Sequence, residues 1–397
     1  MASSLVSVDQ VIETLLEGVV PISANESVKL DEAIGRVLAD DISSPLDVPP
    51  ADNSAMDGYA LDVDDLTIKE GGVYQVSDRI AAGQVGQPLQ PGTFARIFTG
   101  AHIPPRANAV VMQENTEIMD DGVKLNVVPQ KYANIRPRGQ DLAEGDIVLS
   151  RGQRLRPQDV GLMASVGFGE CPVFRRLKVA IMSTGDELVE PPGPVREGQI
   201  FNSNRYTLVA MLRQLGMEVV DLGIVADTPE ATEAALLKGA EEADCIFSSG
   251  GVSVGEEDYV KSSVEKLGSI DIWRIAIKPG KPMAFGSVGE TPFVGLPGNP
   301  VSTFVTFFVI ARPWLLKFQG CNRVYNECFH AVSAFDFDGG KRREYLRVKV
   351  DYEQGLIHKY DNQGSGIMSS VCWADALAEV EVGQQIRAGD RVKIIPI

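Results

Sequence analysis

Apolar residues recur at intervals of three and four between residues 7 and 19, which predicts an amphipathic helix that Ser7 can cap. A shorter run of the same kind predicts a second helix over residues 30–39. From residue 59 the pattern changes to short β-prone runs separated by Gly, Pro and Asn, which is typical of a small all-β module. We expect its strands at residues 74–80, 94–98, 109–112, 116–119, 123–128 and 147–149.

Apolar strand patterns and helical patterns alternate from residue 178 to residue 317. The expected strands are residues 178–182, 218–225, 245–248, 270–277, 283–285 and 293–296. The expected helices are residues 204–215, 229–243 and 259–267, with one more after Pro300. Such alternation predicts a doubly wound, mostly parallel α/β domain. The tail has only short β-prone runs, at residues 329–334, 344–352 and 391–395, and predicts a second small β domain.

The most apolar stretch, residues 301–317, is interrupted by Arg312-Pro313 and contains Ser and Thr. A membrane span needs about 20 mostly apolar residues. We therefore expect a buried helix with a kink at Pro313 and no membrane association.

Composition narrows the class of protein. The chain has 397 residues, 44% of them hydrophobic and 23% charged, which is ordinary for a soluble protein of two to four domains. A formal net charge of −17 argues against nucleic-acid binding, although a local basic cluster could still bind a small anion. The five cysteines form no C-x-x-C pair and the N-terminus has no signal-peptide pattern, so we expect a cytoplasmic protein with free thiols.

Polar residues gather where the predicted strands of the α/β domain end. A Gly-rich loop follows residues 245–248, and its glycines would let backbone N–H groups approach an anion. Lys278, Lys281 and Asn299 follow later apolar runs, and carboxylates such as Asp258 could hold Mg²⁺. The carboxyl ends of strands converge on one crevice in this fold class, so we expect a site for a phosphate-bearing ligand and a metal.

The sequence argues against several other kinds of binding and catalytic site. The chain has no G-x-x-x-x-G-K-[ST] motif, and the spacing of its glycines does not fit a dinucleotide fingerprint. Its three histidines are scattered, which argues against a Ser-His-Asp triad and a His-rich metal site. Taken singly, the carboxylates and lysines would be turn caps or surface charges, and only their coincidence at strand ends favours a site.

Five runs of residues, in this order along the chain, resemble the signatures of the molybdopterin molybdenumtransferase family, to which MoeA and gephyrin belong. They are residues 52–60 (DNSAMDGYA), 182–188 (MSTGDEL), 249–259 (SGGVSVGEEDY), 277–282 (IKPGKP) and 295–302 (GLPGNPVS). The resemblance extends over essentially the whole chain.

The resemblance implies a subunit of four domains and an elongated homodimer. The expected domains are a connecting domain (residues 24–44 and 142–175), a β-rich domain (45–141), an α/β molybdopterin-binding domain (7–23 and 176–328) and a C-terminal barrel-like β domain (329–397).

The resemblance also implies the reaction and the residues that carry it. Adenylylated molybdopterin and molybdate would give molybdenum cofactor and AMP, with Mg²⁺ held by Asp258 and Glu187. The implied catalytic carboxylates are Glu187, Asp227 and Asp258 of the α/β crevice, with Asp57 and Asp141 supplied, like the substrate-binding Thr99, by the partner subunit. The other implied substrate-binding residues are Ser249, Gly250, Gly251, Arg274, Lys278, Lys281, Pro297, Asn299, Pro300, Ser302, Arg347 and Ser365.

Two other functions fit parts of the sequence. One is a nucleotide pyrophosphatase of the CinA-like type, which would leave the β-rich and C-terminal domains unused. The other is a non-catalytic scaffold of the gephyrin type, although no long linker or second cofactor-synthesis domain is present. Further partners that the resemblance suggests are the preceding adenylyltransferase and apo-molybdoenzymes. A preference for tungstate, and the carboxylate that orients the nucleophile, stay open.

Overall fold

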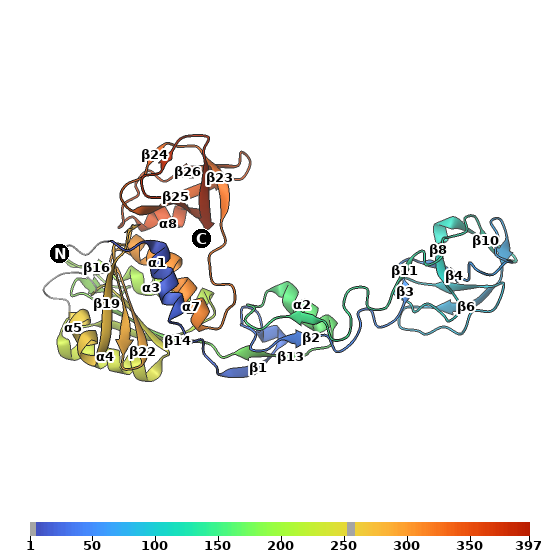
Figure 1. The fold of residues 1–397 in the computed structure, drawn as a ribbon, viewed down its shortest axis with the longest axis horizontal. Coiled ribbons are helices and arrows are strands. Elements are labelled where there is room, and N and C mark those ends of the chain that lie inside the picture. Colours follow the sequence, from blue (N-terminus) through green and yellow to red (C-terminus); the bar gives the residue numbers. More distant parts are fainter. Residues whose placement is uncertain (1–4, 252–258) are drawn as a thin grey trace.

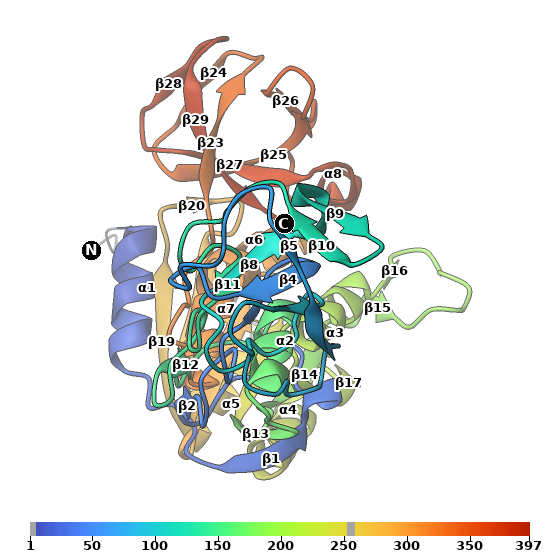
Figure 2. The ribbon, with the colours of Figure 1, turned by 90° about the vertical axis from the view of Figure 1, so that its right-hand side faces the viewer.

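The computed structural model describes residues 5–251 and 259–397, which form an elongated molecule (Figure 1). The α/β domain and the C-terminal barrel lie at one end, with the barrel above the α/β domain in Figure 2, and a β-rich domain lies at the other. A connecting region joins them, and the chain crosses it twice, outward after the N-terminal helix and back again before residue 178. The N-terminal helix therefore belongs to the same end of the molecule as the barrel.

The α/β domain is built on a six-stranded sheet with the order β17-β14-β18-β22-β21-β19. The first four strands are parallel, and β21 is antiparallel to both of its neighbours. The strands are β14 (Lys178–Thr184), β17 (Glu218–Val225), β18 (Cys245–Ser249), β19 (Gly268–Arg274), β21 (Pro282–Val288) and β22 (Thr291–Leu296). The prediction of a doubly wound, mostly parallel domain is confirmed.

Helices cover both faces of this sheet because successive side chains of a strand point to opposite sides. In β14, Val179 and Ile181 belong to one hydrophobic core, whereas Ala180 and Met182 belong to another. The first core includes residues of α1, α3, α6 and α7, and the second includes residues of α4 and α5. The helices are α1 (Val8–Glu17), α3 (Ser203–Gln214), α4 (Pro229–Glu242), α5 (Tyr259–Leu267), α6 (Pro300–Thr306) and α7 (Arg312–Phe318).

A continuous helical segment of 19 residues, Pro300–Phe318, runs through the first core. Its length and composition alone would suffice to cross a membrane, but 72% of its most apolar window is buried inside the protein, as in a core helix. The expected kink at Pro313 stays a prediction, and the structure has a π-helical turn, η3 (Phe307–Ala311), just before this residue. Pro313 has no N–H to donate and its ring crowds the preceding turn, which accounts for the wider turn there.

The C-terminal region is a closed five-stranded barrel. Its strands are hydrogen-bonded in the order β25-β26-β23-β29-β27, and β27 pairs again with β25. They are β23 (Phe329–Ser333), β25 (Arg343–Asp351), β26 (Leu356–Lys359), β27 (Ala376–Val380) and β29 (Arg391–Pro396), with β24 (Phe337–Asp338), β28 (Gln385–Ile386) and α8 (Met368–Trp373) beside them. The barrel predicted at the C-terminus is confirmed.

The β-rich end and the connecting region have separate small cores. The β-rich end contains β3 (Asn53–Ser54), β4 (Gly58–Leu61), β5 (Val73–Tyr74), β6 (Val76–Ile80), β7 (Phe94–Ile97), β8 (Ala109–Met112), η2 (Gln113–Asn115), β9 (Thr116–Met119), β10 (Gly122–Leu125) and β11 (Ile135–Arg136). The connecting region contains β1 (Asn25–Lys29), η1 (Leu30–Glu32), β2 (Ile42–Ser43), β12 (Ile147–Leu149), α2 (Pro157–Ser165) and β13 (Glu170–Phe174). Apolar clusters fill each of the two. The expected domain boundaries themselves stay a prediction.

The helix expected over residues 30–39 is wrong. One 3₁₀ turn, η1, is followed by Gly35 with φ of 74°, a left-handed conformation that no helix interior adopts. The backbone then pairs with the returning chain, as Gly35 and Leu38 donate to the carbonyls of Leu155 and Gln153. The apolar spacing that suggested a helix serves instead to bury side chains around this turn.

A charged clamp fixes the start of β18 against the segment that enters the α/β domain. Arg175 donates two hydrogen bonds to the Asp244 carboxylate, at 2.7 and 2.6 Å, and the Lys178 N–H donates a third at 2.8 Å. Burial alone would raise the pKa of Asp244, but these hydrogen bonds outweigh burial and lower it.

We predict that Asp244→Asn lowers the free energy of unfolding by about 2 kcal/mol at pH 7, a figure that allows for the partial exposure of Arg175. Because the folded-state pKa is lowered, the carboxylate stabilises fully above its unfolded pKa of about 4, and this contribution is lost as the pH falls through the folded value. Urea unfolding from pH 7 towards pH 3 should show the gap between variant and wild type closing.

The control is Asp338→Asn, which removes an exposed ion pair with Arg387 and should leave the unfolding midpoint nearly unchanged. A gap between Asp244→Asn and wild type that stays constant with pH would contradict the role given to the ionised clamp.

Candidate functional site

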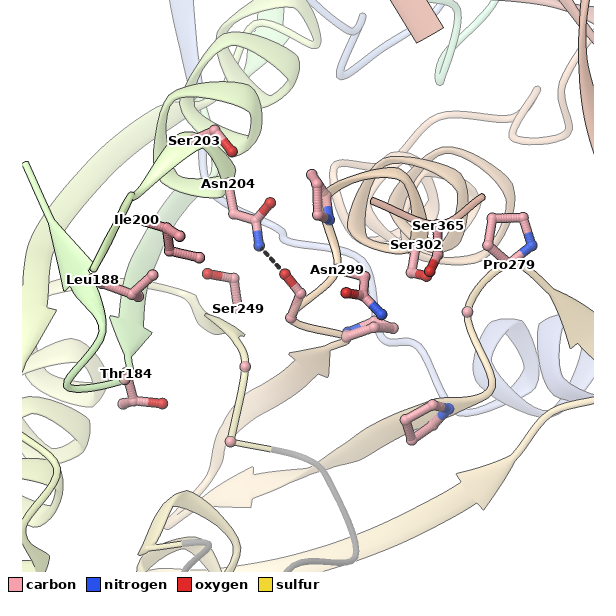
Figure 3. A pocket seen from close by; sticks show the side chains of 18 of the residues that line it. Thr184, Leu188, Ile200, Ser203, Asn204, Ser249, Pro279, Asn299, Ser302 and Ser365 are labelled. Carbon is pink, nitrogen blue, oxygen red and sulfur yellow. Dashed lines mark hydrogen bonds between the residues drawn. The ribbon is translucent and has the colours of Figure 1, made fainter. Parts of the chain in front are cut away.

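A cavity of about 1240 Å³ opens at the carboxyl ends of β14, β18 and β22, where the α/β domain meets the barrel. This is the edge of a parallel sheet at which ligands bind in this fold class. Figure 3 shows side chains from several segments surrounding it. The lining includes most of the residues predicted for the α/β site, together with the predicted Ser365 of the C-terminal domain. The α/β residues are Glu187, Asp227, Ser249, Gly250, Gly251, Lys278, Lys281, Pro297, Asn299, Pro300 and Ser302.

The glycine turn after β18 forms part of the floor. Gly250 and Gly251 have φ of 91° and 68°, and a Cβ on Gly251 would lie 2.4 Å from Val260 Cγ2. Both positions therefore require glycine for conformation, and Gly251 also for space. Ser249 joins β14 through a 3.0 Å hydrogen bond between its hydroxyl and that of Ser183. The Gly250 N–H donates to the Leu296 carbonyl at 3.1 Å, so the turn is fixed to β22 while all three of its residues line the cavity.

A second turn, between β22 and α6, closes the cavity from the side. Asn204 Nδ2 donates to the Gly298 carbonyl at 2.7 Å, which ties this turn to the start of α3 (Figure 3). Thr303 Oγ1 donates to the Asn299 carbonyl at 3.0 Å. The turn carries Asn299 and Pro300 and is thus anchored at both ends.

The acidic lining residues come from the ends of two strands. Glu187 follows β14, and Asp227 follows β17. Asp258 lies outside the described residues, so its predicted place beside them stays a prediction. Among residues 5–251 and 259–397 no group of three His, Cys, Asp or Glu side chains could hold a metal. Mg²⁺ typically needs only one or two protein carboxylates when a phosphate is bound, and Glu187 and Asp227 supply oxygen ligands of this type to the lining.

The basic lining residues come from both domains. Lys278 and Lys281 flank a turn with a cis peptide bond between Lys278 and Pro279. Lys278 Nζ forms a 2.9 Å ion pair with Glu344 of the barrel. Arg342, also from the barrel, lines the cavity and donates to the Ile277 carbonyl at 3.1 Å. This end of the cavity therefore gathers three cations in a chain whose net charge is −17.

Two binding residues predicted in the α/β domain and the barrel do not line the cavity. Arg274 ends β19, where its carbonyl accepts a hydrogen bond from the Val6 N–H. Arg347 is buried in the barrel, and burial lowers its pKa to about 10. It donates to the carbonyl of Gly364 at 3.3 Å and to Ser370 Oγ at 3.1 Å. Arg347 thus supports the loop that carries Ser365, a lining residue, without reaching the ligand space itself.

Two of the residues predicted in the β-rich domain, Asp57 and Thr99, adjoin β4 and β7, which lie at the far end of the molecule from this cavity (Figure 1). Asp57 Oδ1 accepts hydrogen bonds from the Thr99 N–H and Oγ1, both at 2.8 Å. The hydrogen bond from the Thr99 backbone, followed by that from its hydroxyl, lowers the pKa of Asp57. Asp141 is exposed near the connecting region. Within one chain, these residues do not join the cavity.

The sequence analysis missed several polar lining residues, among them Arg342, Asn204 and Gln363. A signal for Arg342 was present, since Lys341-Arg342-Arg343 is a basic run directly before an expected strand. Nothing in the sequence distinguished Asn204 or Gln363 from ordinary surface amides.

Comparison with known proteins gives the same picture across the chain. Residues 6–167 match the model of the MoeA N-terminal region (domain I and II), residues 180–317 match a probable molybdopterin binding domain, and residues 330–397 match the MoeA C-terminal region (domain IV).

Two curated relatives and one solved structure extend over nearly the whole chain. A molybdopterin molybdenumtransferase of Haemophilus influenzae is 43% identical, over 99% of this chain and 98% of its own. One from Nostoc is 36% identical, over 94% and 88%. The crystal structure of the molybdopterin biosynthesis MoeA protein from Pyrococcus horikoshii OT3 is 30% identical, over 99% and 100%, with a TM-score of 0.87. The chain belongs to the molybdopterin molybdenumtransferase (MoeA) family of enzymes.

Proposed function

We propose that the protein inserts molybdate into adenylylated molybdopterin, releasing AMP and forming molybdenum cofactor. One observation carries the proposal: a single cavity of about 1240 Å³ is lined by a glycine turn, two carboxylates and three cations. The family relatives, named for molybdenum transfer to molybdopterin, support the same reaction.

The cationic end suits a small tetrahedral dianion. Lys278, Lys281 and Arg342 supply charged N–H donors, and hydrogen bonds to charged groups are the strong ones. The hydroxyls of Ser302 and Ser365 lie on the same side of the cavity (Figure 3). The dithiolene sulfurs of the pterin hold molybdenum in the product, so the protein itself needs no soft ligands.

The glycine turn suits the phosphates of the nucleotide. Releasing AMP breaks the P–O bond between AMP and the pterin phosphate, and an oxygen of water or molybdate forms the new bond to phosphorus. Glu187, Asp227 and Asp258 are the carboxylates that would hold Mg²⁺ or orient this oxygen. When bound, Mg²⁺ would stabilise the charge that spreads over the phosphoryl oxygens.

The two alternative functions receive less support. A CinA-like pyrophosphatase would leave the β-rich end and the barrel without a role, whereas matches to the family cover both. The scaffold function leaves the lined cavity unexplained. A test separates all three: purified protein with adenylylated pterin should release AMP only when molybdate is added. A pyrophosphatase would release AMP without molybdate, and a scaffold would release none.

The proposal includes a homodimer with composite active sites and a cytoplasmic location. The Asp57–Thr99 pair is preformed but remote from the cavity of its own chain, which is what a site completed across a two-fold homodimer would require. Cys171, Cys245, Cys321, Cys328 and Cys372 are all free thiols, in keeping with a reducing cytoplasm. The preceding adenylyltransferase and the apo-molybdoenzymes are the proposed partners, and no membrane or nucleic acid is involved.

Replacing Lys278 should separate the two substrates. We predict that Lys278→Ala raises the dissociation constant for molybdate by about 10- to 100-fold, because a small anion depends on few charged hydrogen bonds. Binding of the adenylylated pterin should weaken far less, since its contacts are spread over the cavity. Calorimetric titration of each ligand alone measures both. Lys393→Ala is the matched control, because Lys393 pairs with Glu379 of the same barrel at 2.8 Å but does not line the cavity. Equal losses for both ligands would sink the assignment.

Replacing Glu187 should change the requirement for metal. We predict that Glu187→Gln raises the Mg²⁺ concentration for half-maximal AMP release by about tenfold, because a hard cation loses one charged oxygen ligand. Glu197→Gln serves as control, since Glu197 is exposed on the loop between β15 (Leu188–Val189) and β16 (Ile200–Phe201) and does not line the cavity. An unchanged Mg²⁺ curve for Glu187→Gln would remove it from the metal site.

Mixing two inactive variants should test the composite site. We expect Asp57→Ala and Lys278→Ala each to be nearly inactive alone. If each site takes the β-rich end of one chain and the cavity of the other, a mixed dimer has one doubly damaged site and one intact site. Equal amounts refolded together make about half the dimers mixed, so about a quarter of wild-type activity should return. No recovery, while wild type treated alike recovers, would place the whole site within one chain.

A further inference from the structure

The seam between the α/β domain and the barrel passes directly beside the cationic end of the cavity. Strand β20 (Ile277–Lys278) adds to the barrel sheet in parallel with the start of β25, pairing Ile277 with Arg343 and Lys278 with Glu344. The N–H of Arg343 donates to the Ala276 carbonyl at 2.8 Å. One short strand of the α/β domain is thus built into the barrel.

Glu344 is the acidic residue of this seam. Its side chain is 6% exposed and is not part of the cavity lining, whereas the side chain of Lys278 is 48% exposed and does line the cavity. Glu344 Oε2 lies 2.9 Å from Lys278 Nζ, and Oε1 accepts a hydrogen bond from the Gly340 N–H at 3.2 Å. The carboxylate is therefore held in place behind the lysine.

We propose that Glu344 is a positioning residue that tunes the affinity of the cavity for oxyanions through Lys278. The inference rests on the proposed function, in which Lys278 binds the oxyanion. Glu344 orients the ammonium group and at the same time opposes part of its charge. The result is a cationic end that binds a dianion weakly enough for it to exchange.

The ammonium group has three donors, of which Glu344 takes one. An oxyanion bound to a second donor would then lie within a few ångströms of the carboxylate, and like charges repel strongly at that range where water is partly excluded. Changing the carboxylate to an amide keeps an oxygen acceptor for Lys278 but removes the negative charge. In the variant, the side chain of residue 344 can still orient the Lys278 ammonium group, but it no longer repels the oxyanion.

The test is Glu344→Gln in the full-length protein, with molybdate as the probe. We expect the dissociation constant for molybdate, measured by calorimetry, to fall by about tenfold. The apparent KM for molybdate in AMP release should fall with it. If Glu344 only held the barrel in place, its loss would weaken molybdate binding and the KM would rise. Weaker or unchanged binding in the variant overturns the proposal.

A second variant, Glu344→Asp, keeps the proposal testable if Glu344→Gln does not fold. Glu344→Asp draws the carboxylate back from Lys278 and should tighten molybdate binding to a value between wild type and Glu344→Gln. Glu379→Gln is the matched control, because Glu379 is another largely buried carboxylate of the barrel that pairs with a lysine, Lys393. It should leave the molybdate affinity unchanged. Tightening by Glu379→Gln as well, or no tightening by Glu344→Asp, contradicts a local effect on Lys278.

The failure of the proposed function gives a different result. If wild type binds no molybdate, or if Lys278→Ala binds it as well as wild type does, then Lys278 is not an oxyanion ligand. If wild type binds molybdate through Lys278 but Glu344→Gln does not bind it more tightly, the oxyanion site stands and the role of Glu344 falls.

Discussion

The cavity exists because two domains share a strand. The parallel pairing of Ile277 and Lys278 with Arg343 and Glu344 places the barrel against the carboxyl edge of the α/β sheet. That contact brings Arg342, Gln363 and Ser365 over the glycine turn and the lysines. A second contact, from the Val301 N–H to the Ser365 carbonyl at 3.0 Å, fixes the barrel to the start of α6. Without this seam, the carboxyl edge of the α/β sheet would lack the part of the cavity lining that the barrel supplies.

The α/β domain and its glycine turn could be predicted because their signals are local. Residues 218–225 and 259–267 were predicted with the bounds that the structure gives to β17 and α5. The strand ends carry Glu187, Asp227 and Ser249 to one edge by topology alone, and all three line the cavity. Where a fold rule converts sequence order into position, sequence analysis suffices.

The features of the site and fold that could not be predicted depend on contacts between residues far apart in the chain. Arg342 and Arg347 are five residues apart in one basic stretch, and only the barrel decides which lines the cavity and which is buried behind it. The pair of Lys278 and Glu344 joins two domains and leaves no periodic signal. The prediction of a helix around Gly35 was wrong for a related reason. The backbone there forms hydrogen bonds with residues 153–155, more than a hundred residues away in the chain, and these bonds override the helical spacing of the apolar residues.

The two crossings of the connecting region have a consequence for how the protein is made. Helix α1 packs on α7 in the first core, yet all of residues 18–299 are synthesised before that helical segment begins. On the ribosome, the connecting and β-rich regions can emerge and fold before α7 has been synthesised. During that time Val8, Val11 and Leu15 of α1 have no α7 to pack against. The apolar side chains of this segment thus stay without their partner through most of translation, and completing the active end of the enzyme is among the last events of its synthesis.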